Sequence, residues 1–288
     1  MSGAPSLSDT LDQALAGTLP GLSMPAHLLG EALELSPATQ GLRARYPGRV
    51  HLLPAADATL VGVGLGLAMS GAPAVVELAD PTALWAALPQ LAEASALHGA
   101  EAPLRLVIRV PCGPDRAPVP PEELLSGLPG LALAAAADHA ELVPLLQAAL
   151  AFGGPVVLLE SRLALAGRGA ETREALPLGR ARLRRAGTDA SALAFGEGVA
   201  AALAAADILA AEGISLEVFD LRCLRPLDSD AIAASVQATG RPVVVGAAGP
   251  ALLAAVQHAF LRLESPPSWV AEPQVQAVVE AVRASVRY

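Results

Sequence analysis

Short apolar runs alternate with Ala/Leu-rich helical stretches along the first 165 residues of the chain. Runs of this length, bounded by Gly, Pro or polar residues, are typical of strands that are buried on both faces of a parallel sheet. The most apolar stretch, Leu60–Val76, predicts a buried helix that leads into a strand, since it falls short of the roughly 20 residues that span a bilayer. The predicted strands are Ala26–Leu29, Ala74–Leu78, Leu104–Val110, Leu131–Ala134 and Pro155–Glu160.

The pattern breaks at Ala166–Thr188, which is rich in Gly and Arg. Such a stretch predicts an exposed connection, so we expect two domains that meet near residue 180, 1–180 and 181–288. A second alternation then predicts an α/β fold in which each domain is a mostly parallel sheet flanked by helices. Its predicted strands are Ala190–Phe195, Leu216–Asp220 and Pro242–Gly246, and its predicted helices are Gly198–Glu212 and Asp228–Thr239.

Composition narrows the class of protein without showing an activity. Hydrophobic residues make up 53% of the 288 residues and charged residues 16%, which argues against disorder. The net charge of −9, with scattered arginines, offers no basic face for nucleic acid. Cys112 and Cys223 lie far apart and outside any metal-binding motif, and the first residues lack a signal-peptide pattern, so a cytoplasmic location is expected.

The segment Gly213–Val245 carries the most specific pattern in the chain: a strand, a D-L-R turn, an R-P-L-D helix start and a T-G-R-x-V-V-V strand. Asp220 and Arg222 are expected to fix a sharp turn, and Asp228 to cap the next helix. In order and spacing, the segment resembles the C-terminal domain that transketolases share with the beta subunits of 2-oxo-acid dehydrogenases. Gly213 is a suitable residue to end the preceding helix.

The resemblance continues upstream through Leu28–Glu31, RYPGRV, Leu60–Val76, LRLVIRVPCG and GGPVVLLESR, and so covers nearly the whole chain. The chain is similar to the beta-type subunit of the decarboxylating component of a thiamine-diphosphate-dependent 2-oxo-acid dehydrogenase. The resemblance implies a pyrimidine-binding-type domain at 1–180 and a transketolase C-terminal-type domain at 181–288.

The resemblance also implies partners. An alpha-type decarboxylase subunit would bind the diphosphate and its magnesium, and the acyl group would pass to a lipoyl acyltransferase core. The chain has no G-D-G motif with a downstream Asn, so it is not expected to hold thiamine diphosphate alone. A hetero-oligomer, in the form of a heterotetramer, is the expected assembly.

By register with the family, Asp57 occupies the position of the glutamate that protonates the pyrimidine ring nitrogen. The acid is retained but is one methylene shorter. A second reading makes Asp57 the capping residue of a helix that starts at Thr59. Both readings stay open.

Three further positions bear on the cofactor or substrate. Ala83 stands where the family places an aromatic ring against the pyrimidine, and Trp85 lies two residues on. The loop DRAPVPPEE, near Ala117, lacks the family's histidine. Glu31 matches the acid of the family's L-G-E element, although a solvated glutamate at a helix start is an alternative reading.

Other readings compete with these. Gly62, Gly64 and Gly66 could form a dinucleotide-binding loop if a strand preceded them. Cys112 follows a predicted strand at its ligand-facing end, but no base is predictable beside it. None of the five histidines has a partner pattern, and His51 is the one nearest to Asp57 in sequence.

Two functions follow from the resemblance. One is oxidative decarboxylation of pyruvate or a branched-chain 2-oxo acid, carried out with the alpha-type partner. The other is a degenerate, non-catalytic paralogue that keeps the fold as a structural or regulatory subunit, which the changes at Asp57, Ala83 and the loop favour. A self-sufficient transketolase is disfavoured, because a diphosphate-binding half is absent from this length.

Overall fold

The computed structural model describes residues 6–54, 57–97, 103–112, 120–166, 173–247 and 249–288. The chain divides into two compact units, Met1–Leu178 and Gly179–Tyr288.

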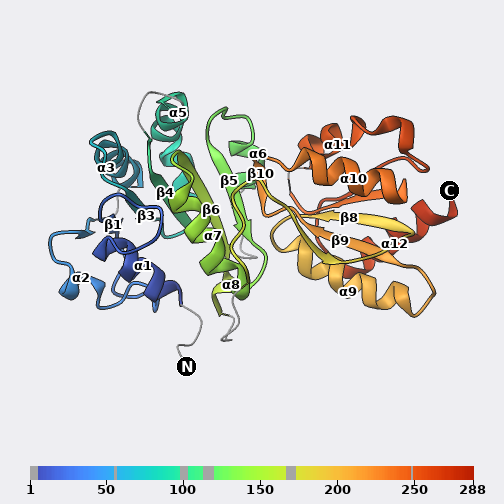
Figure 1. Cartoon of the computed structure of the whole chain (residues 1–288), viewed down its shortest axis with the longest axis horizontal. Coiled ribbons are helices and arrows are strands. Elements are labelled where there is room, and N and C mark those ends of the chain that lie inside the picture. The colour runs from blue at the N-terminus through green and yellow to red at the C-terminus, as the bar shows by residue number, and fades with distance from the viewer. Residues whose placement is uncertain (1–5, 55–56, 98–102, 113–119, 167–172, 248) are drawn as a thin grey trace. The chain divides into compact units, whose positions relative to one another are not determined.

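The first unit alternates strands and helices, as the apolar runs predict (Figure 1). Its strands are β1 (His27–Gly30), β2 (Val50–Leu52), β3 (Ala74–Glu77), β4 (Leu106–Cys112), β5 (Ala132–Ala136) and β6 (Pro155–Ser161). Its helices are α1 (Leu7–Ala16), α2 (Leu42–Arg45), α3 (Asp57–Met69), α4 (Ala83–Ala86), α5 (Leu88–Leu97), α6 (Pro121–Leu125), α7 (His139–Ala151) and α8 (Arg162–Ala166).

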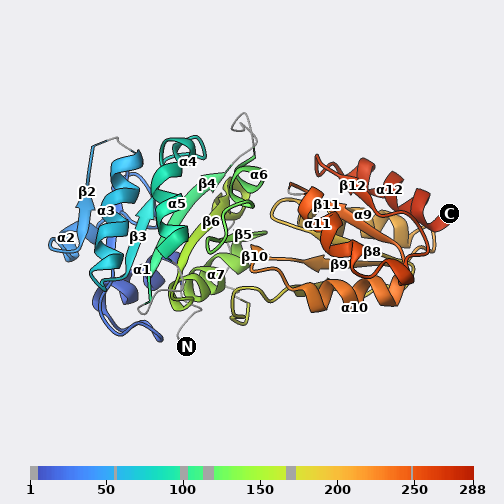
Figure 2. The same cartoon turned by 90° about the horizontal axis from the view of Figure 1, so that it is seen from above.

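These strands lie side by side in the order β5-β6-β4-β3-β1-β2, and every neighbouring pair is parallel. The connections from β2 to β3 and from β3 to β4 run one way across the sheet, whereas the connection from β5 to β6 runs the other way. Right-handed crossovers therefore put α3 and α5 on one face and α7 on the other, where α1 packs against α7 (Figure 2). The sheet is covered on both faces.

Helix α3 packs closely on the sheet at Gly64. A Cβ added at Gly64 would lie 2.5 Å from Cγ2 of Val76 on β3, so any larger residue would push the helix away. Gly62, Gly64 and Gly66 all lie inside this helix and not in a turn between a strand and a helix. The reading of these glycines as a dinucleotide-binding loop is therefore wrong.

The second unit has a second sheet with helices on both faces (Figure 1). The strands of this unit are β7 (Arg182–Arg185), β8 (Ala190–Ala194), β9 (Leu216–Asp220), β10 (Cys223–Arg225), β11 (Pro242–Val245) and β12 (Ser268–Val270), and β10 does not belong to this sheet. Its helices are α9 (Gly198–Ala210), α10 (Ser229–Thr239), α11 (Gly249–Gln257), the 3-10 turn η1 (Phe260–Arg262) and α12 (Val275–Arg287).

The five-stranded sheet has the order β12-β11-β8-β9-β7, parallel except for the edge strand β7, which pairs antiparallel with β9. Helices α9 and α12 pack together on one face, and α10 and α11 on the other. The prediction of an exposed connection through residue 188 is wrong at β7. This strand was missed because it is short, rich in arginine and only partly buried.

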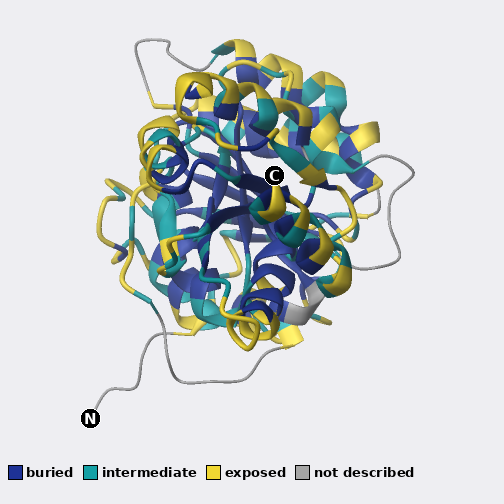
Figure 3. Ribbon diagram, turned by 90° about the vertical axis from the view of Figure 1, so that its right-hand side faces the viewer, coloured by how far each residue is buried: buried dark blue, intermediate teal, exposed yellow. Residues whose placement is uncertain are grey.

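Buried residues, dark blue in Figure 3, concentrate on the strands and on the inner sides of the helices. The α/β class with two mostly parallel sheets is confirmed. Small aliphatic side chains form most of this core, in keeping with a chain that is only 3% aromatic. No helix among the described residues is both long enough and apolar enough to cross a membrane.

Candidate active site

Three acidic residues follow neighbouring strands at one edge of the first unit's sheet. Glu31 comes directly after β1, Asp57 begins α3 after β2, and Glu77 is the last residue of β3. Strand β1 lies between β2 and β3. Because the carboxyl ends of parallel strands meet at one edge, the topology brings these acids to the edge where open α/β sheets bind ligands.

Asp57 is half-buried and is the first residue of α3. The helix therefore starts two residues earlier than Thr59, and Asp57 belongs to its first turn instead of preceding it as the cap. A carboxylate there is favoured by the positive end of the helix dipole. The interpretation of Asp57 as the cap of a helix that begins at Thr59 is therefore wrong. The role of Asp57 toward a ligand stays a prediction.

Glu31 is exposed and lies in a bend. The chain continues through turns, held in part by the Thr39 hydroxyl, which donates to the Leu33 carbonyl at 2.6 Å. The next helix, α2, begins only at Leu42. The alternative of a glutamate at a helix start is thus wrong, because no helix follows β1 directly.

Ala83 is the first residue of α4 and is 3% exposed. Its position is set by the turn before it, in which the Thr82 amide donates to Oδ1 of Asp80 at 2.7 Å. A methyl group offers no ring face to a pyrimidine. Trp85 is 40% exposed, and two helical residues are about 200° apart around the axis, so its ring lies on the other side of α4 from Ala83.

The structure adds a buried ionic triad at this edge that the sequence reading missed. Arg109 of β4 donates from Nε and Nη2 to the two carboxylate oxygens of Glu160 on β6, both at 2.8 Å. Its Nη1 donates to Glu77 of β3 at 2.7 Å. One guanidinium thereby links the side chains of three adjacent strands.

The triad holds two carboxylates and one guanidinium almost out of water: side-chain exposures are 2% for Arg109, 1% for Glu160 and 12% for Glu77. Burial raises the pKa of the Glu77 carboxyl, an effect that Arg109 opposes and Glu160 reinforces. For Arg109, burial works against the charge, yet the two carboxylates raise the pKa of the guanidinium. The Glu77 carboxyl therefore takes up a proton more readily than an ordinary glutamate.

A signal for the triad exists in the sequence. Each of the runs AVVE, LVIRV and VVLLE places one charged residue within or at the end of an otherwise apolar strand. Charged residues are almost never fully buried unless they are paired. Three such strands in one sheet are thus an indication of an ion-paired cluster.

In the second unit, the turn after β9 is built as expected. Oδ1 of Asp220 accepts from the Arg222 amide at 3.0 Å, and Oδ2 accepts from Nη1 of Arg184 at 3.2 Å. Arg222 has a positive φ of 55°, which the sharp turn requires. Asp228 caps α10 by accepting from the Ala231 amide at 3.2 Å, and this prediction is confirmed. Helix α9 ends at Ala210, and Gly213 takes a positive φ of 82° in the turn beyond it.

Cys112 ends β4 at the carboxyl edge of the first sheet, as expected, and is half-buried. The residues that follow, 113–119, lie outside the described part of the chain, and Ala117 lies among them, whereas the last residues of its loop, from Pro121 on, form the start of α6. Within the described ranges, no group of three or more His, Cys, Asp or Glu side chains is arranged to hold a metal ion.

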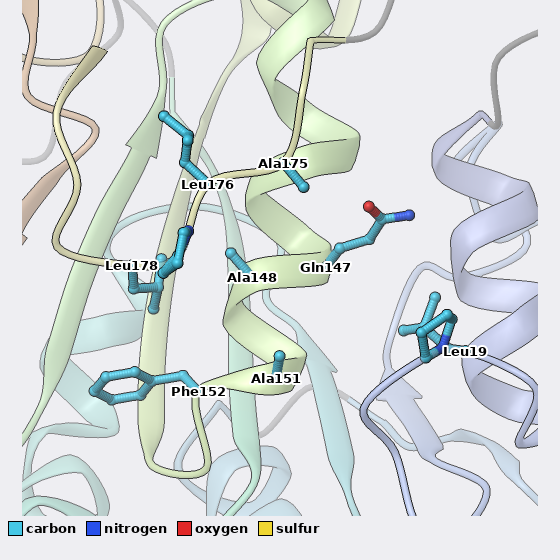
Figure 4. A pocket seen from close by; sticks show the side chains of 10 residues that line it. Leu19, Gln147, Ala148, Ala151, Phe152, Ala175, Leu176 and Leu178 are labelled. Atoms are coloured by element: carbon cyan, nitrogen blue, oxygen red, sulfur yellow. The ribbon is translucent and has the colours of Figure 1, made fainter.

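A pocket of about 420 Å³ lies elsewhere in the first unit (Figure 4). It is lined by the Leu19–Pro20 turn, the end of α7 and residues 175–178, and its walls are mostly apolar, with the Gln147 side chain extending from α7. The end of α7 lies near the amino ends of the strands, since crossover helices run antiparallel to the strands they connect. Asp57, Glu31 and Ala83 do not line this pocket. It is therefore distinct from the edge of the sheet where the three acidic residues lie.

Comparison with known proteins gives the family. Residues 24–167 match the pyrimidine binding domain of transketolase, and residues 179–284 match the transketolase C-terminal domain. A pyruvate dehydrogenase E1 component subunit beta from Leifsonia xyli is 36% identical over 247 residues, which cover 79% of this chain and 73% of the relative. A 3-methyl-2-oxobutanoate dehydrogenase subunit beta from Mycobacterium tuberculosis is 32% identical over 248 residues, 79% of this chain and 71% of the relative.

The fold is also shared with a solved structure described as a split gene transketolase, inactive beta4 tetramer. Its TM-score is 0.78 at 22% identity, over 98% of this chain and 97% of that chain. These matches define a two-domain, transketolase-like protein. The chain belongs to this family and, within it, is a distant relative of the E1 beta subunits of 2-oxo-acid dehydrogenases.

Proposed function

We propose that the chain is the beta-type subunit of a thiamine-diphosphate-dependent 2-oxo-acid dehydrogenase. With an alpha-type partner, it would take part in the oxidative decarboxylation of pyruvate or a branched-chain 2-oxo acid and in acyl transfer to a lipoyl carrier. Residues 1–180 would supply the pyrimidine-binding part, and residues 181–288 the C-terminal part. The relatives named above are themselves subunits beta, which supports a heteromeric assembly.

The observation that carries the proposal is the place of Asp57. A half-buried carboxyl group begins α3 at the carboxyl edge of a domain that matches the pyrimidine-binding model. Such a group fits one interaction, a hydrogen bond to a ring nitrogen. The described residues include no group of three or more His, Cys, Asp or Glu side chains that could hold a metal ion, and the proposal assigns the diphosphate and its magnesium to the alpha-type partner.

When bound between the subunits, thiamine diphosphate would supply the electron sink for decarboxylation. The Asp57 carboxyl would hold a proton at the pyrimidine ring nitrogen, and Glu31, at the next strand end, would face the same region. Because Asp is one methylene shorter than Glu, a displacement of about 1 Å at this group would cost on the order of a hundredfold in rate. Slow turnover is therefore part of the proposal, as is a cytoplasmic location.

The test uses the chain co-expressed with an alpha-type partner that carries an intact G-D-G motif. We expect 2-oxo-acid-dependent reduction of an artificial electron acceptor, and a loss of about 10²–10⁴-fold in kcat for Asp57→Asn. Glu93→Gln, on the exposed side of α5, is the matched control and should keep full activity. Equal rates for wild type and Asp57→Asn would remove the role of Asp57.

A second candidate function is a non-catalytic subunit, and the buried methyl of Ala83 favours it. In that case, the unmodified complex should show no thiamine diphosphate binding by calorimetry in the presence of Mg²⁺. Asp57→Glu combined with Ala83→Phe should then restore binding, with thermal unfolding used to check that α4 accommodates the ring. Tight binding by the unmodified complex would count against this candidate.

A further inference from the structure

Two histidines on the adjacent strands β1 and β2 of the first unit have their imidazole rings in contact. His27 is the first residue of β1, and His51 lies in the edge strand β2, opposite Leu29. Because residues 27 and 29 share a face of the strand, both imidazoles lie on one side of the sheet. Nδ1 of His27 is 3.0 Å from Nε2 of His51.

The two rings meet edge to edge. Their planes differ by only 13°, and their centroids are 5.3 Å apart. That separation is the sum of the N···N distance and the distance from each nitrogen to the centre of its own ring. The rings therefore lie in line and not face to face. One nitrogen donates and the other accepts, which requires at least one unprotonated nitrogen in the gap.

We propose that His27 and His51 form a two-imidazole site for a divalent transition-metal ion of the nickel and copper class. With metal–nitrogen bonds of 2.0–2.1 Å, two ligands at a right angle are about 2.9 Å apart, and two at a tetrahedral angle about 3.3 Å apart. The observed 3.0 Å lies nearer to the right angle, which square-planar and octahedral ions prefer. Water would complete the coordination, because the described residues add no third ligand to this pair.

Binding requires a change in both rings, because their facing nitrogens point at each other and not at a common metal position. The ring that donates moves its proton from the inner to the outer nitrogen, so that both inner nitrogens are bare with no net loss of a proton. Each ring then turns about its outer side-chain torsion, whose energy profile in histidine is broad. Both residues are only half-buried and β2 is an edge strand, so there is room for this turn and for bound water.

The nearby charges set the expected strength. Imidazole binds a metal ion only in its neutral form, so protons compete with the metal. Arg49 also opposes a cation, although its Nη1 is directed to the Leu15 carbonyl at 2.6 Å. The site should therefore bind ions that prefer imidazole ligands, such as Ni²⁺ and Cu²⁺, and should not bind Mg²⁺.

The experiment is a calorimetric titration of the full-length, chelator-treated chain with NiCl₂ at pH 7.5, with MgCl₂ as the negative control. We expect one Ni²⁺ per chain and a loss of affinity of more than about tenfold in His27→Ala and in His51→Gln. Glutamine can still hydrogen-bond to His27 but is a poor ligand for Ni²⁺. His258→Ala, at an exposed histidine in the second unit, is the matched control and should bind as wild type does.

Thermal unfolding separates binding from folding. In chelator, His51→Gln should unfold within a few degrees of wild type, while added Ni²⁺ should raise the Tm of wild type and not that of the variant. Copper bound to wild type should show two nitrogen ligands in its electron paramagnetic resonance spectrum. Wild type that binds no Ni²⁺, or variants that bind it as tightly as wild type, would overturn the proposal.

Discussion

Both units bury a cluster of carboxylates and guanidinium groups at the carboxyl end of a strand, but the clusters join different parts of the chain. In the second unit, Asp220 accepts from the amide of Arg222, two residues away, and from Arg184 on the neighbouring β7. In the first unit, Arg109 joins Glu77 and Glu160, each from a different strand. The cluster of the second unit fixes a local turn. The triad of the first unit ties together separate strands and carries an excess negative charge.

The comparison predicts that the triad is the more sensitive of the two. Arg109→Met would leave two carboxylates buried without their cation, which should lower the free energy of unfolding by about 3–5 kcal/mol at neutral pH. Urea denaturation followed by circular dichroism measures this loss. Arg43→Met, on the exposed side of α2, is the control. A loss no larger than that of the control would mean that the triad is not an energetic unit.

Asp220→Ala should have a smaller effect, because it removes the ion pair with Arg184 and the hydrogen bond from the Arg222 amide, whereas Arg109→Met removes ion pairs to two carboxylates. We expect a loss of about 1–3 kcal/mol in the free energy of unfolding. The same urea experiment applies, with Asp230→Ala in the exposed first turn of α10 as the control. If Asp220→Ala costs more than Arg109→Met, the ranking of the two clusters is reversed.

Glu77→Gln sharpens the comparison through pH. Because burial raises the pKa of Glu77 in the folded state, its contribution to stability is fully present below its unfolded pKa, about 4.5, and is lost as pH rises through the folded value. Glutamine does not titrate and still accepts from Arg109. The variant should therefore gain stability relative to wild type as pH rises from 4.5. If the difference in the free energy of unfolding between the variant and wild type stayed constant from pH 4 to pH 8, the raised pKa of Glu77 would be contradicted.

The smallest effect is expected at His27, away from both clusters. Burial lowers its pKa, so its contribution to stability is present above the unfolded value of about 6.5 and is lost as pH falls through the folded value. His27→Gln should thus flatten the fall in Tm between pH 7 and 5, measured in chelator. His258→Gln serves as the control, and an unchanged pH profile in His27→Gln would rule out this contribution.

The same contrast explains what the sequence could predict. Asp220, Arg222 and Asp228 lie within nine residues. The turn after β9 and the cap of α10 could therefore be predicted from the local order of residue types. Eight strands, β1, β3, β4, β5, β6, β8, β9 and β11, could be predicted as apolar runs, whereas the short strands β2, β7, β10 and β12 were missed. The cation at position 109 meets Glu160 across 51 residues, and no local pattern states which strands will be neighbours.

Misread segments share a physical cause. Strand β7 is held by its pairing with β9, and its own arginine-rich sequence resembles a loop. The residues after Glu31 form turns held by contacts such as Thr39 with Leu33, which outweigh their helix-like composition. At the candidate site, the sequence indicated the acids at the strand ends, but burial decided that Ala83 points inward and Trp85 outward.

The guanidinium of Arg109 has a consequence for how the family can diverge. Loss of either partner leaves a charge in the interior, whereas replacement of all three by apolar residues of similar volume is often neutral or stabilising. Positions 77, 109 and 160 should therefore change together in evolution or not at all. Among relatives of this chain, an apolar residue at one of the three positions should predict apolar residues at the other two.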